Sequence, residues 1–203
     1  MNTMRKRQYF NDVASRWDSL PGPPDAWQRT ACFVDKMCVS DGKCVLDVGC
    51  GTGILVEHLA RALSPTATLV ELDLAEQMLY ESVRTHPNTR VARICADARY
   101  LPLASGSFDA VLCFGVLPHL GAPEAVIVEL LRVLHPGGTL GVGHLMDSEE
   151  LNAFHARLGP PIAGDHLPSA RVLGEILCRA GVVSVVTEEH PGWYFVRAVK
   201  GTR

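Results

Sequence analysis

A glycine-rich turn is the part of this sequence whose residue types and spacing point most directly to chemistry. Residues 47–53 are DVGCGTG, between a strand-like run and a helix-like run. Glycine lets the backbone turn tightly and lie against a ligand where a Cβ would intrude. A strand, a glycine turn and a helix form the usual cradle for a nucleotide-like cofactor in an α/β protein. The dinucleotide fingerprint G-x-G-x-x-G would need glycine at position 54, where Ile54 stands, so the spacing argues against a nicotinamide dinucleotide.

Four histidines in the second half of the chain are candidates for proton transfer. His119 and His144 each follow or close a strand-like run, whereas His155 and His166 lie in the segment 146–168. A histidine at neutral pH accepts a proton from a hydroxyl or a thiol. For His119 a structural place at a helix start or in the cofactor loop competes with catalysis, and His144 is a candidate for catalysis or for metal binding. The spacing between His155 and His166 matches no recognised ligand pattern, so we expect no metal.

Strand-like and helix-like runs alternate through most of the chain, and they must position these residues. The strand-like runs are 44–48, 68–73, 90–95, 108–114, 139–144, 182–187 and 194–199. The helix-like runs are 54–63, 75–84, 123–134 and 169–180. Such alternation is typical of right-handed βαβ units, which build a parallel sheet covered by helices on both faces.

Two segments lie outside this alternation. Residues 1–40 predict two helices parted by PGPP, and the first carries Phe10, Val13 and Trp17 at helical spacing, an apolar stripe that must cover something. The segment 146–168 combines a helix-like run with glycines and prolines. We predict one domain, made of a helical cap (1–40), a cofactor-binding core (43–145), an insertion or lid (146–168) and a C-terminal helix and hairpin (169–203).

Composition excludes several classes of protein. A net charge of −3 over 203 residues provides no basic field for nucleic acid or an anionic membrane. No apolar run approaches the roughly 20 residues that span a bilayer, and no signal-peptide pattern follows the first basic residues. The seven cysteines form no C-x-x-C pair, which favours buried thiols in a reducing cell over zinc. We expect a cytoplasmic monomer or homodimer without nucleic-acid or membrane partners.

Four motifs, in order between residues 43 and 145, resemble those of the class I S-adenosylmethionine (SAM) dependent methyltransferases. They are the glycine turn, VELDLAEQML at 70–79, CADA at 95–98, and GSFDAVLC at 106–113 followed by ELLRVLHPGG at 129–138. The resemblance implies a Rossmann-like α/β fold with a seven-stranded, mostly parallel sheet of order 3-2-1-4-5-7-6 and an antiparallel last strand. It also implies SAM as the cofactor and S-adenosylhomocysteine as its product.

The resemblance assigns roles to individual residues. Asp73 stands where the family receives both ribose hydroxyls, but Glu71 points to the same side of the strand, and the choice between them stays open. Leu74 is expected on the adenine face, and Asp97 and Ala98 match the residues that bind the adenine edge. The cofactor residues expected in this way are Asp47, Gly49, Cys50, Gly51, Gly53, Asp73, Leu74, Asp97, Ala98 and Phe114.

The class of methyl acceptor depends on the residues after the run 108–114. Enzymes that methylate nucleic-acid or protein amide nitrogens often carry an Asn/Asp-Pro-Pro-Tyr type tetrapeptide there, and LPHL stands at 117–120 instead. That form, with YFNDVASRWD at 9–18, resembles the small-molecule branch related to the quinone-biosynthesis methyltransferases. The resemblance makes Tyr9 and Trp17 candidate lid residues, with a hydrophobic anchor as the equal alternative.

These observations predict a SAM-dependent methyltransferase that transfers a methyl group in line to a small molecule. His144 and His119 are the candidate catalytic residues, and the candidate substrate contacts are Tyr9, Trp17, His119, His144 and His166. A non-catalytic SAM-binding or partner-binding protein is the main alternative, because no residue is evidently catalytic from the sequence. An NAD-dependent oxidoreductase is a weaker one.

Overall fold

The computed structural model describes residues 2–39, 44–87, 90–121 and 123–202. The predicted segment boundaries at residues 40 and 43 lie outside the described residues. The strands are β1 (Cys44–Val48), β2 (Thr68–Asp73), β3 (Val91–Cys95), β4 (Phe108–Phe114), β5 (Leu134–His144), β6 (Val182–His190) and β7 (Trp193–Lys200). The helices are α1 (Asn2–Val13), α2 (Ala26–Met37), α3 (Val56–Ala62), α4 (Glu76–Thr85), α5 (Pro123–Val133), α6 (Ser148–Leu158) and α7 (Ala170–Arg179), with 3-10 turns η1 (Ala14–Ser19) and η2 (Leu117–Leu120).

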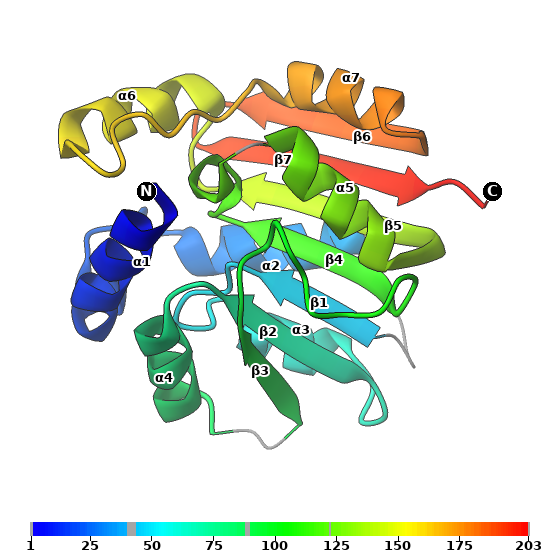
Figure 1. The fold of residues 1–203 in the computed structure, drawn as a ribbon, viewed down its shortest axis with the longest axis horizontal. Coiled ribbons are helices and arrows are strands. Elements are labelled where there is room, and N and C mark those ends of the chain that lie inside the picture. Colours follow the sequence, from blue (N-terminus) through cyan, green and yellow to red (C-terminus); the bar gives the residue numbers. More distant parts are fainter. Residues whose placement is uncertain (1, 40–43, 88–89, 122, 203) are drawn as a thin grey trace.

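One sheet organises the molecule, with the order β3-β2-β1-β4-β5-β7-β6 (Figure 1). The strands β1 to β5 pair in parallel, and β7 is antiparallel to both β5 and β6. The antiparallel step follows from the short connection between β6 and β7, where His190 pairs with Trp193 across a two-residue loop. A loop of that length joins only antiparallel neighbours. The predicted strand order and the antiparallel last strand are confirmed.

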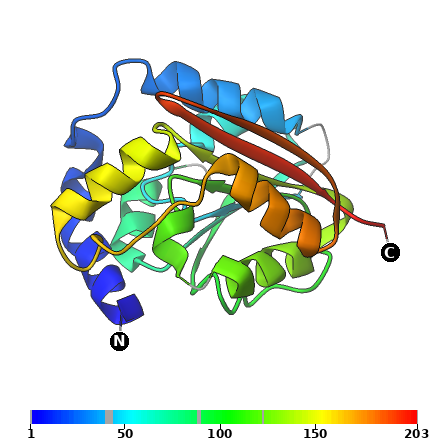
Figure 2. The same ribbon diagram turned by 90° about the horizontal axis from the view of Figure 1, so that it is seen from above.

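Helices cover both faces of the sheet, as Figure 2 shows from above. On one face α2 and α3 pack on the sheet through buried residues that include Phe33 and Leu59. On the other face α5 and α7 do so through Leu130 and Leu173, among others. The central strands β1, β2 and β4 are therefore buried on both sides, which explains their nearly continuous apolar sequences, whereas the edge strands β3 and β6 are mostly exposed or half-buried.

The strand β5 begins earlier than predicted. The sequence predicts a helix to residue 134 and a strand from 139, but the helix ends at Val133 and β5 starts at Leu134. The β4–β5 pairing begins at Phe108 with Leu134 and then shifts register before Ala110 pairs with Thr139. An irregularity of this kind absorbs extra residues within a ladder. The HPGG segment, which resembles a turn in sequence, is thus accommodated inside a strand.

Of the segments outside the alternation, α2 packs on a face of the sheet, whereas α1 and α6 lie at the end of the sheet to which the arrows of β1, β4 and β5 point (Figure 1). There α1 packs on α4 in a cluster that includes Val13, Ala14 and Met78. The helix α6 begins with a capping box, in which Asp147 accepts from the Glu150 amide at 2.9 Å and Glu150 accepts from the Asp147 amide at 3.1 Å. No helix of the described residues has both the length and the apolarity needed to cross a membrane.

The helix α5 offers a matched test of this packing. Leu130 is 0% exposed, whereas Val128 on the same helix is 61% exposed. We expect Leu130→Ala to lower the free energy of unfolding by about 2–5 kcal/mol, because it leaves a cavity between helix and sheet. Val128→Ala should stay within about 0.5 kcal/mol of the parent. Urea titration followed by circular dichroism measures both, and equal losses would contradict the assigned face of α5.

Candidate functional site

A cavity of about 630 Å³ lies at the carboxyl ends of the parallel strands. Its wall combines the glycine turn, the ends of β2 to β5, and residues of α1, η1 and α6. Its volume is within the range of small-molecule and cofactor sites, and the carboxyl edge is where open α/β sheets bind ligands. The cavity is therefore enclosed by the carboxyl edge of the sheet, by the cap and by the segment after β5.

The glycine turn forms the floor of one end of this cavity. Gly49 has a φ of 68°, and a Cβ there would lie 2.1 Å from Cγ2 of Val116. Gly51 has a φ of 55°, and a Cβ there would meet no atom within 4 Å. Gly49 donates its amide to the Leu72 carbonyl at 2.6 Å, which fastens the turn to β2. Gly49 is thus required by packing, while Gly51 leaves open space for a ligand to approach the backbone.

Asp73 lies beside this turn at the end of β2. Its Oδ2 accepts from the Gly51 amide at 3.0 Å, and its Oδ1 accepts from the Ala75 amide at 2.8 Å. Burial raises the pKa of Asp73 to about 6, against the lowering effect of the backbone hydrogen bonds. A carboxylate has about four acceptor positions, so the half-buried Asp73 can still accept from a pair of ligand hydroxyls.

Glu71 has a different place, which separates the two acidic candidates of β2. Its side chain is 0% exposed and does not line the cavity. It pairs with Nε of Arg93 at 2.8 Å and accepts from Oγ of Ser82 at 2.7 Å. Burial raises the pKa of Glu71, and these partners oppose the rise. Between the two carboxylates, only Asp73 is within reach of a ligand in the cavity.

Asp97, after β3, lines the same end of the cavity as the turn. Arg99 donates to it through Nε at 3.0 Å and through Nη2 at 2.6 Å, which holds the pKa of Asp97 below its usual value. The same Nη2 donates to Oγ1 of Thr3 at 2.8 Å. Arg99 therefore links the adenine-edge candidate to the cap, a contact that no motif indicated.

All but two of the predicted cofactor residues line the cavity, namely Gly49, Cys50, Gly51, Asp73, Leu74, Asp97, Ala98 and Phe114. The two others are the first and last residues of the turn. Asp47 is buried, its Oδ2 has no hydrogen-bond partner among the described residues, and burial, followed by the charges of Glu71 and Asp73, raises its pKa well above normal. A Cβ at Gly53 would lie 3.0 Å from Oε1 of Glu71, so Gly53 serves packing. Burial also raises the pKa of the Cys50 thiol, which argues against a thiolate there.

Polar side chains gather at the other end of the cavity. His119, from η2, lies 2.6 Å through Nδ1 from Oδ2 of Asp165. Lys6, from α1, lies 2.5 Å from Oδ1 of the same carboxylate and donates to the His119 carbonyl at 2.9 Å. Both Lys6 and Asp165 are buried. Hydrogen bonds from His119 and Lys6 outweigh burial and hold the pKa of Asp165 below its usual value.

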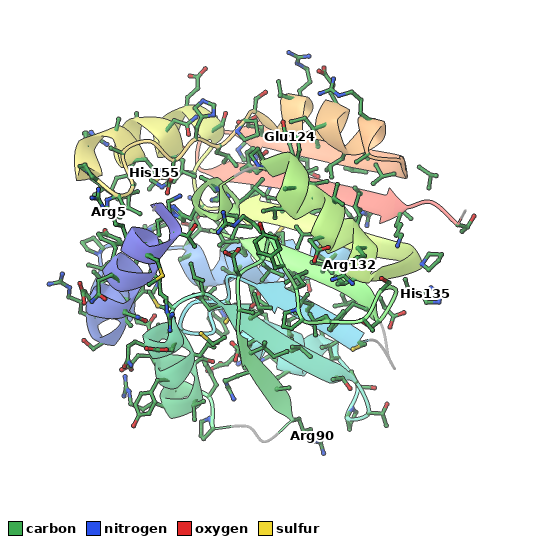
Figure 3. All side chains as sticks on the ribbon, viewed as in Figure 1. Arg5, Arg90, Glu124, Arg132, His135 and His155 are labelled. Carbon is green, nitrogen blue, oxygen red and sulfur yellow. The ribbon has the colours of Figure 1, made fainter. Side chains whose placement is uncertain are left out.

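Two further histidines border this cluster. His155 donates through Nδ1 to the Asp165 carbonyl at 3.1 Å, and its ring centroid is 4.8 Å from that of His119. Figure 3 shows His155 on the side of α6 that faces α1. His144, at the end of β5, is 3% exposed, and none of the described residues forms a hydrogen bond with its Nε2. Burial, with smaller effects of His119 and His155, lowers the pKa of His144 to about 3, so this ring is neutral at physiological pH.

The predicted substrate contacts divide in the same way. Trp17, His119 and His144 line the cavity, but His166 is exposed and lies outside it. Tyr9 does not line it either and packs edge-on against Phe10, which also packs edge-on against Trp17 and His119. No three or more His, Cys, Asp or Glu side chains of the described residues are grouped to hold a metal ion.

The sequence analysis did not assign several of the lining residues to the site, although the helical spacing within α1 could have indicated some of them. Thr3, Lys6 and Phe10 line the cavity together. Their spacing of three and four residues is that of one helix face, so placing Trp17 over the site would have implied them. Nothing in the sequence pairs Asp165 with His119.

Comparison with known proteins identifies the family of this site. Residues 46–142 match the model of the methyltransferase domain, and this range contains the glycine turn, Asp73 and Asp97. Residues 46–142 therefore belong to the methyltransferase domain family, with the motifs of the class I SAM-dependent methyltransferases. SAM is the cofactor of this family.

Relatives of this chain support the same conclusion. A malonyl-[acyl-carrier protein] O-methyltransferase of Laribacter hongkongensis is 37% identical over 71% of this chain and 52% of its own length. A demethylmenaquinone methyltransferase of Renibacterium salmoninarum is 36% identical over 66% of this chain and 55% of its own length. The chain thus spans about half the length of these relatives.

A solved structure supports the fold. A Haemonchus contortus phosphoethanolamine N-methyltransferase, solved with phosphomonomethylethanolamine and S-adenosylhomocysteine, superposes with a TM-score of 0.76 at 17% identity. The alignment covers 98% of this chain and 59% of that one.

The assignment of Glu71 as a buried partner of Arg93, and not as a cofactor ligand, can be tested without a ligand. Arg93→Met should lower the free energy of unfolding by about 3–5 kcal/mol, because it leaves the buried Glu71 carboxylate unpaired. The double variant Glu71→Leu with Arg93→Met should recover most of this loss, since neither charge then stays buried. Thermal or urea unfolding measures the cycle, and strictly additive losses would contradict a coupled buried pair.

Proposed function

We propose that the protein transfers the methyl group of SAM to a small molecule held in the same cavity. The observation that carries the proposal is that one cavity of about 630 Å³ has the glycine turn and Asp73 at one end and His119 with His144 at the other. A transferase needs donor and acceptor side by side and shielded from water. A cavity with a cofactor end alone would suit a simple binding protein better.

The residues at the first end fit SAM. Gly51 leaves open space at its Cα, Asp73 keeps acceptor positions for the ribose hydroxyls, and Leu74 offers an apolar wall. Asp97 and the amide of Ala98 would hold the adenine edge. When bound, SAM supplies a methyl group that is already activated on a sulfonium, so the protein has to align the reactants and exclude water.

We propose that the part of the cap formed by α1 and η1 performs this exclusion together with the segment 146–168. Oγ1 of Thr52, next to the glycine turn, donates to Oδ1 of Asp18 in η1 at 2.6 Å, which holds the cap over the cofactor end. At the other end Lys6 binds Asp165, so that cap and segment meet over the cavity. The cap residues Tyr9 and Trp17 then differ in role, because Trp17 lines the cavity and Tyr9 anchors the helix.

A small molecule is the acceptor that the wall favours. Its second half contains apolar side chains, among them Leu120, Leu151 and Phe154. The net charge of −3 and the cap over the carboxyl edge give no basic groove for a nucleic acid. The relatives are named for different acceptors, so their names alone do not identify the acceptor here.

Calorimetry and methyl turnover together test this function against its alternatives. We expect SAM and S-adenosylhomocysteine to bind and NAD not to bind; NAD binding without SAM binding would point to an oxidoreductase. Incubation with methyl-labelled SAM and a cell metabolite extract should then move label into a small molecule. Tight SAM binding with no transfer would support the non-catalytic alternative and contradict methyl transfer.

The pKa of Asp73 predicts how cofactor binding depends on pH. The folded-state pKa of about 6 lies above the ordinary value of 3.8. Ribose hydroxyls need the ionised carboxylate, so the affinity for S-adenosylhomocysteine should fall as the pH drops through 6. At pH 5 about a tenth of the carboxyl is ionised, so the Kd should rise about tenfold relative to pH 7.5.

Two variants test this pH dependence by calorimetry. Asp73→Asn should weaken binding at pH 7.5 by about 1.5–3 kcal/mol, the usual worth of a charged hydrogen bond, and should remove the change between pH 7.5 and 5. Asp12→Asn, at an exposed position on α1, should keep the parent curve. An unchanged pH dependence in Asp73→Asn would assign it to another group.

A further inference from the structure

We propose that Nε2 of His119 is the general base of this site, that Asp165 and Lys6 position it, and that the acceptor is a hydroxyl or a thiol on an apolar body. This inference rests on the proposed function. It adds a catalytic assembly from three segments that no motif connects: α1, η2 and the stretch between α6 and α7. It also assigns the chemical class of the acceptor.

The three side chains of this assembly are largely removed from solvent. Side chains of Lys6 and Asp165 are 6% and 5% exposed, and that of His119 is 15% exposed. A buried ion pair is weak evidence of a contribution to stability, because desolvation offsets its attraction. Here both charged partners bind His119, one at its ring and one at its carbonyl. That arrangement fixes the position of an imidazole ring in the cavity wall.

The hydrogen bonds also determine which ring nitrogen carries the proton. The pKa of Asp165 is below its usual value, so its carboxylate is ionised at neutral pH and only accepts hydrogen bonds. Nδ1 of His119, 2.6 Å away, is therefore the donor. In the neutral ring Nε2 is then unprotonated and carries a lone pair. A ring that accepts a proton at one nitrogen while a carboxylate holds the other is the arrangement of a general base.

The other titratable groups around His119 are less suited to act as the general base. His155 donates through Nδ1 to the Asp165 carbonyl, and burial lowers its pKa, with the Asp165 hydrogen bond opposing. His144 lies at the cavity wall, buried and neutral, and its Nε2 has no hydrogen-bond partner in the part of the chain that the structure describes. Lys6 is committed to Asp165 and to the His119 carbonyl. His119 alone among them has a ring held by a carboxylate, and His144 offers an unfilled polar position for the acceptor.

The acceptor class follows from the charges already matched in this cavity. An ammonium group would need a free carboxylate, but Asp165 is occupied by Lys6 and His119, and Asp97 by Arg99. The two other carboxylates of the lining, Asp18 with its Thr52 hydroxyl partner and Asp73, lie at the cofactor end of the cavity. A hydroxyl or a thiol needs only a base for its proton. The apolar wall near His119 contains Phe10, at 5.2 Å between ring centroids, as well as Leu120, Leu151 and Phe154.

The step balances without a further reactant. The acceptor oxygen or sulfur forms a bond to the methyl carbon, while the bond between that carbon and the sulfonium breaks and its electron pair stays on sulfur. The acceptor proton moves to Nε2 of His119, and the imidazolium is stabilised by Asp165. The products are the methyl ether or thioether and S-adenosylhomocysteine, and the proton then passes to solvent.

Nitrogen-15 NMR of histidine-labelled protein tests the assembly without any ligand. Long-range ¹H–¹⁵N spectra at pH 7.5 should show His119 with Nδ1 protonated and Nε2 free. His119→Gln assigns the signal by its loss, and His135→Gln is the control, since His135 is exposed and lies at the opposite end of the molecule from His155 (Figure 3). A His119 ring protonated at Nε2 overturns the proposal.

Asp165→Asn tests the positioning role. We expect the His119 signals to lose their preference for the Nδ1-protonated form, while circular dichroism and the Kd for S-adenosylhomocysteine stay within about threefold of the parent. Asp12→Asn, on the surface of α1, should leave the tautomer unchanged. An unaltered tautomer in Asp165→Asn contradicts positioning by this carboxylate, and the parent spectrum alone decides the tautomer if the variant does not fold.

The acceptor class is tested with two probes of similar shape. We titrate 4-butylphenol and 4-butylbenzylamine into protein saturated with S-adenosylhomocysteine and follow the His119 Nε2 signal. The phenol should shift it and bind at least about tenfold more tightly, whereas binding of the amine as tight as that of the phenol, or a shift by neither, overturns the class. Absent binding of S-adenosylhomocysteine would instead contradict the proposed function, and the tautomer experiment would stand apart from it.

Discussion

The parallel pairing of β1 with β2 on one side and β4 on the other is the constraint on which the site depends. The register that pairs Leu46 with Val70 and with Val111 brings the carboxyl ends of the three strands to one edge. Parallel strands need long crossovers, so the helices that make them cover the faces and leave this edge to loops. The glycine turn, Asp73 and the chain after β4 meet there because of this register.

Buried ion pairs hold the elements that surround the carboxyl edge of the sheet. Glu71 and Arg93 tie β2 to β3 below the cofactor end, and Lys6 and Asp165 tie the cap to the stretch after α6 above the acceptor end. An unpaired buried charge costs several kcal/mol, so each pair tolerates few alternative arrangements. The cap is held over the cavity by specific polar contacts as well as by the apolar cluster between α1 and α4.

Much of the fold followed from local pattern. Alternating runs predicted the strands within a few residues, because a strand buried on both faces carries a continuous apolar sequence. The start of β5 was missed, since proline and two glycines resemble a turn and only the pairing with β4 shows that Leu134 is already in the ladder. At the cofactor end the turn and Asp73 were visible in sequence for the same local reason: their roles depend on backbone conformation and strand position.

The sequence by itself determined the sheet, the cofactor turn and, through its motifs, the family. The tertiary structure alone decided which carboxylate of β2 faces the cavity and that His119 pairs with the carboxylate of Asp165. Lys6 and His119 are 113 residues apart, and His119 and Asp165 are 46 apart. No periodicity encodes contacts over such separations. They form because the cap and the stretch after α6 fold over the same edge of the sheet, where charges that are removed from water are stable only when they are paired.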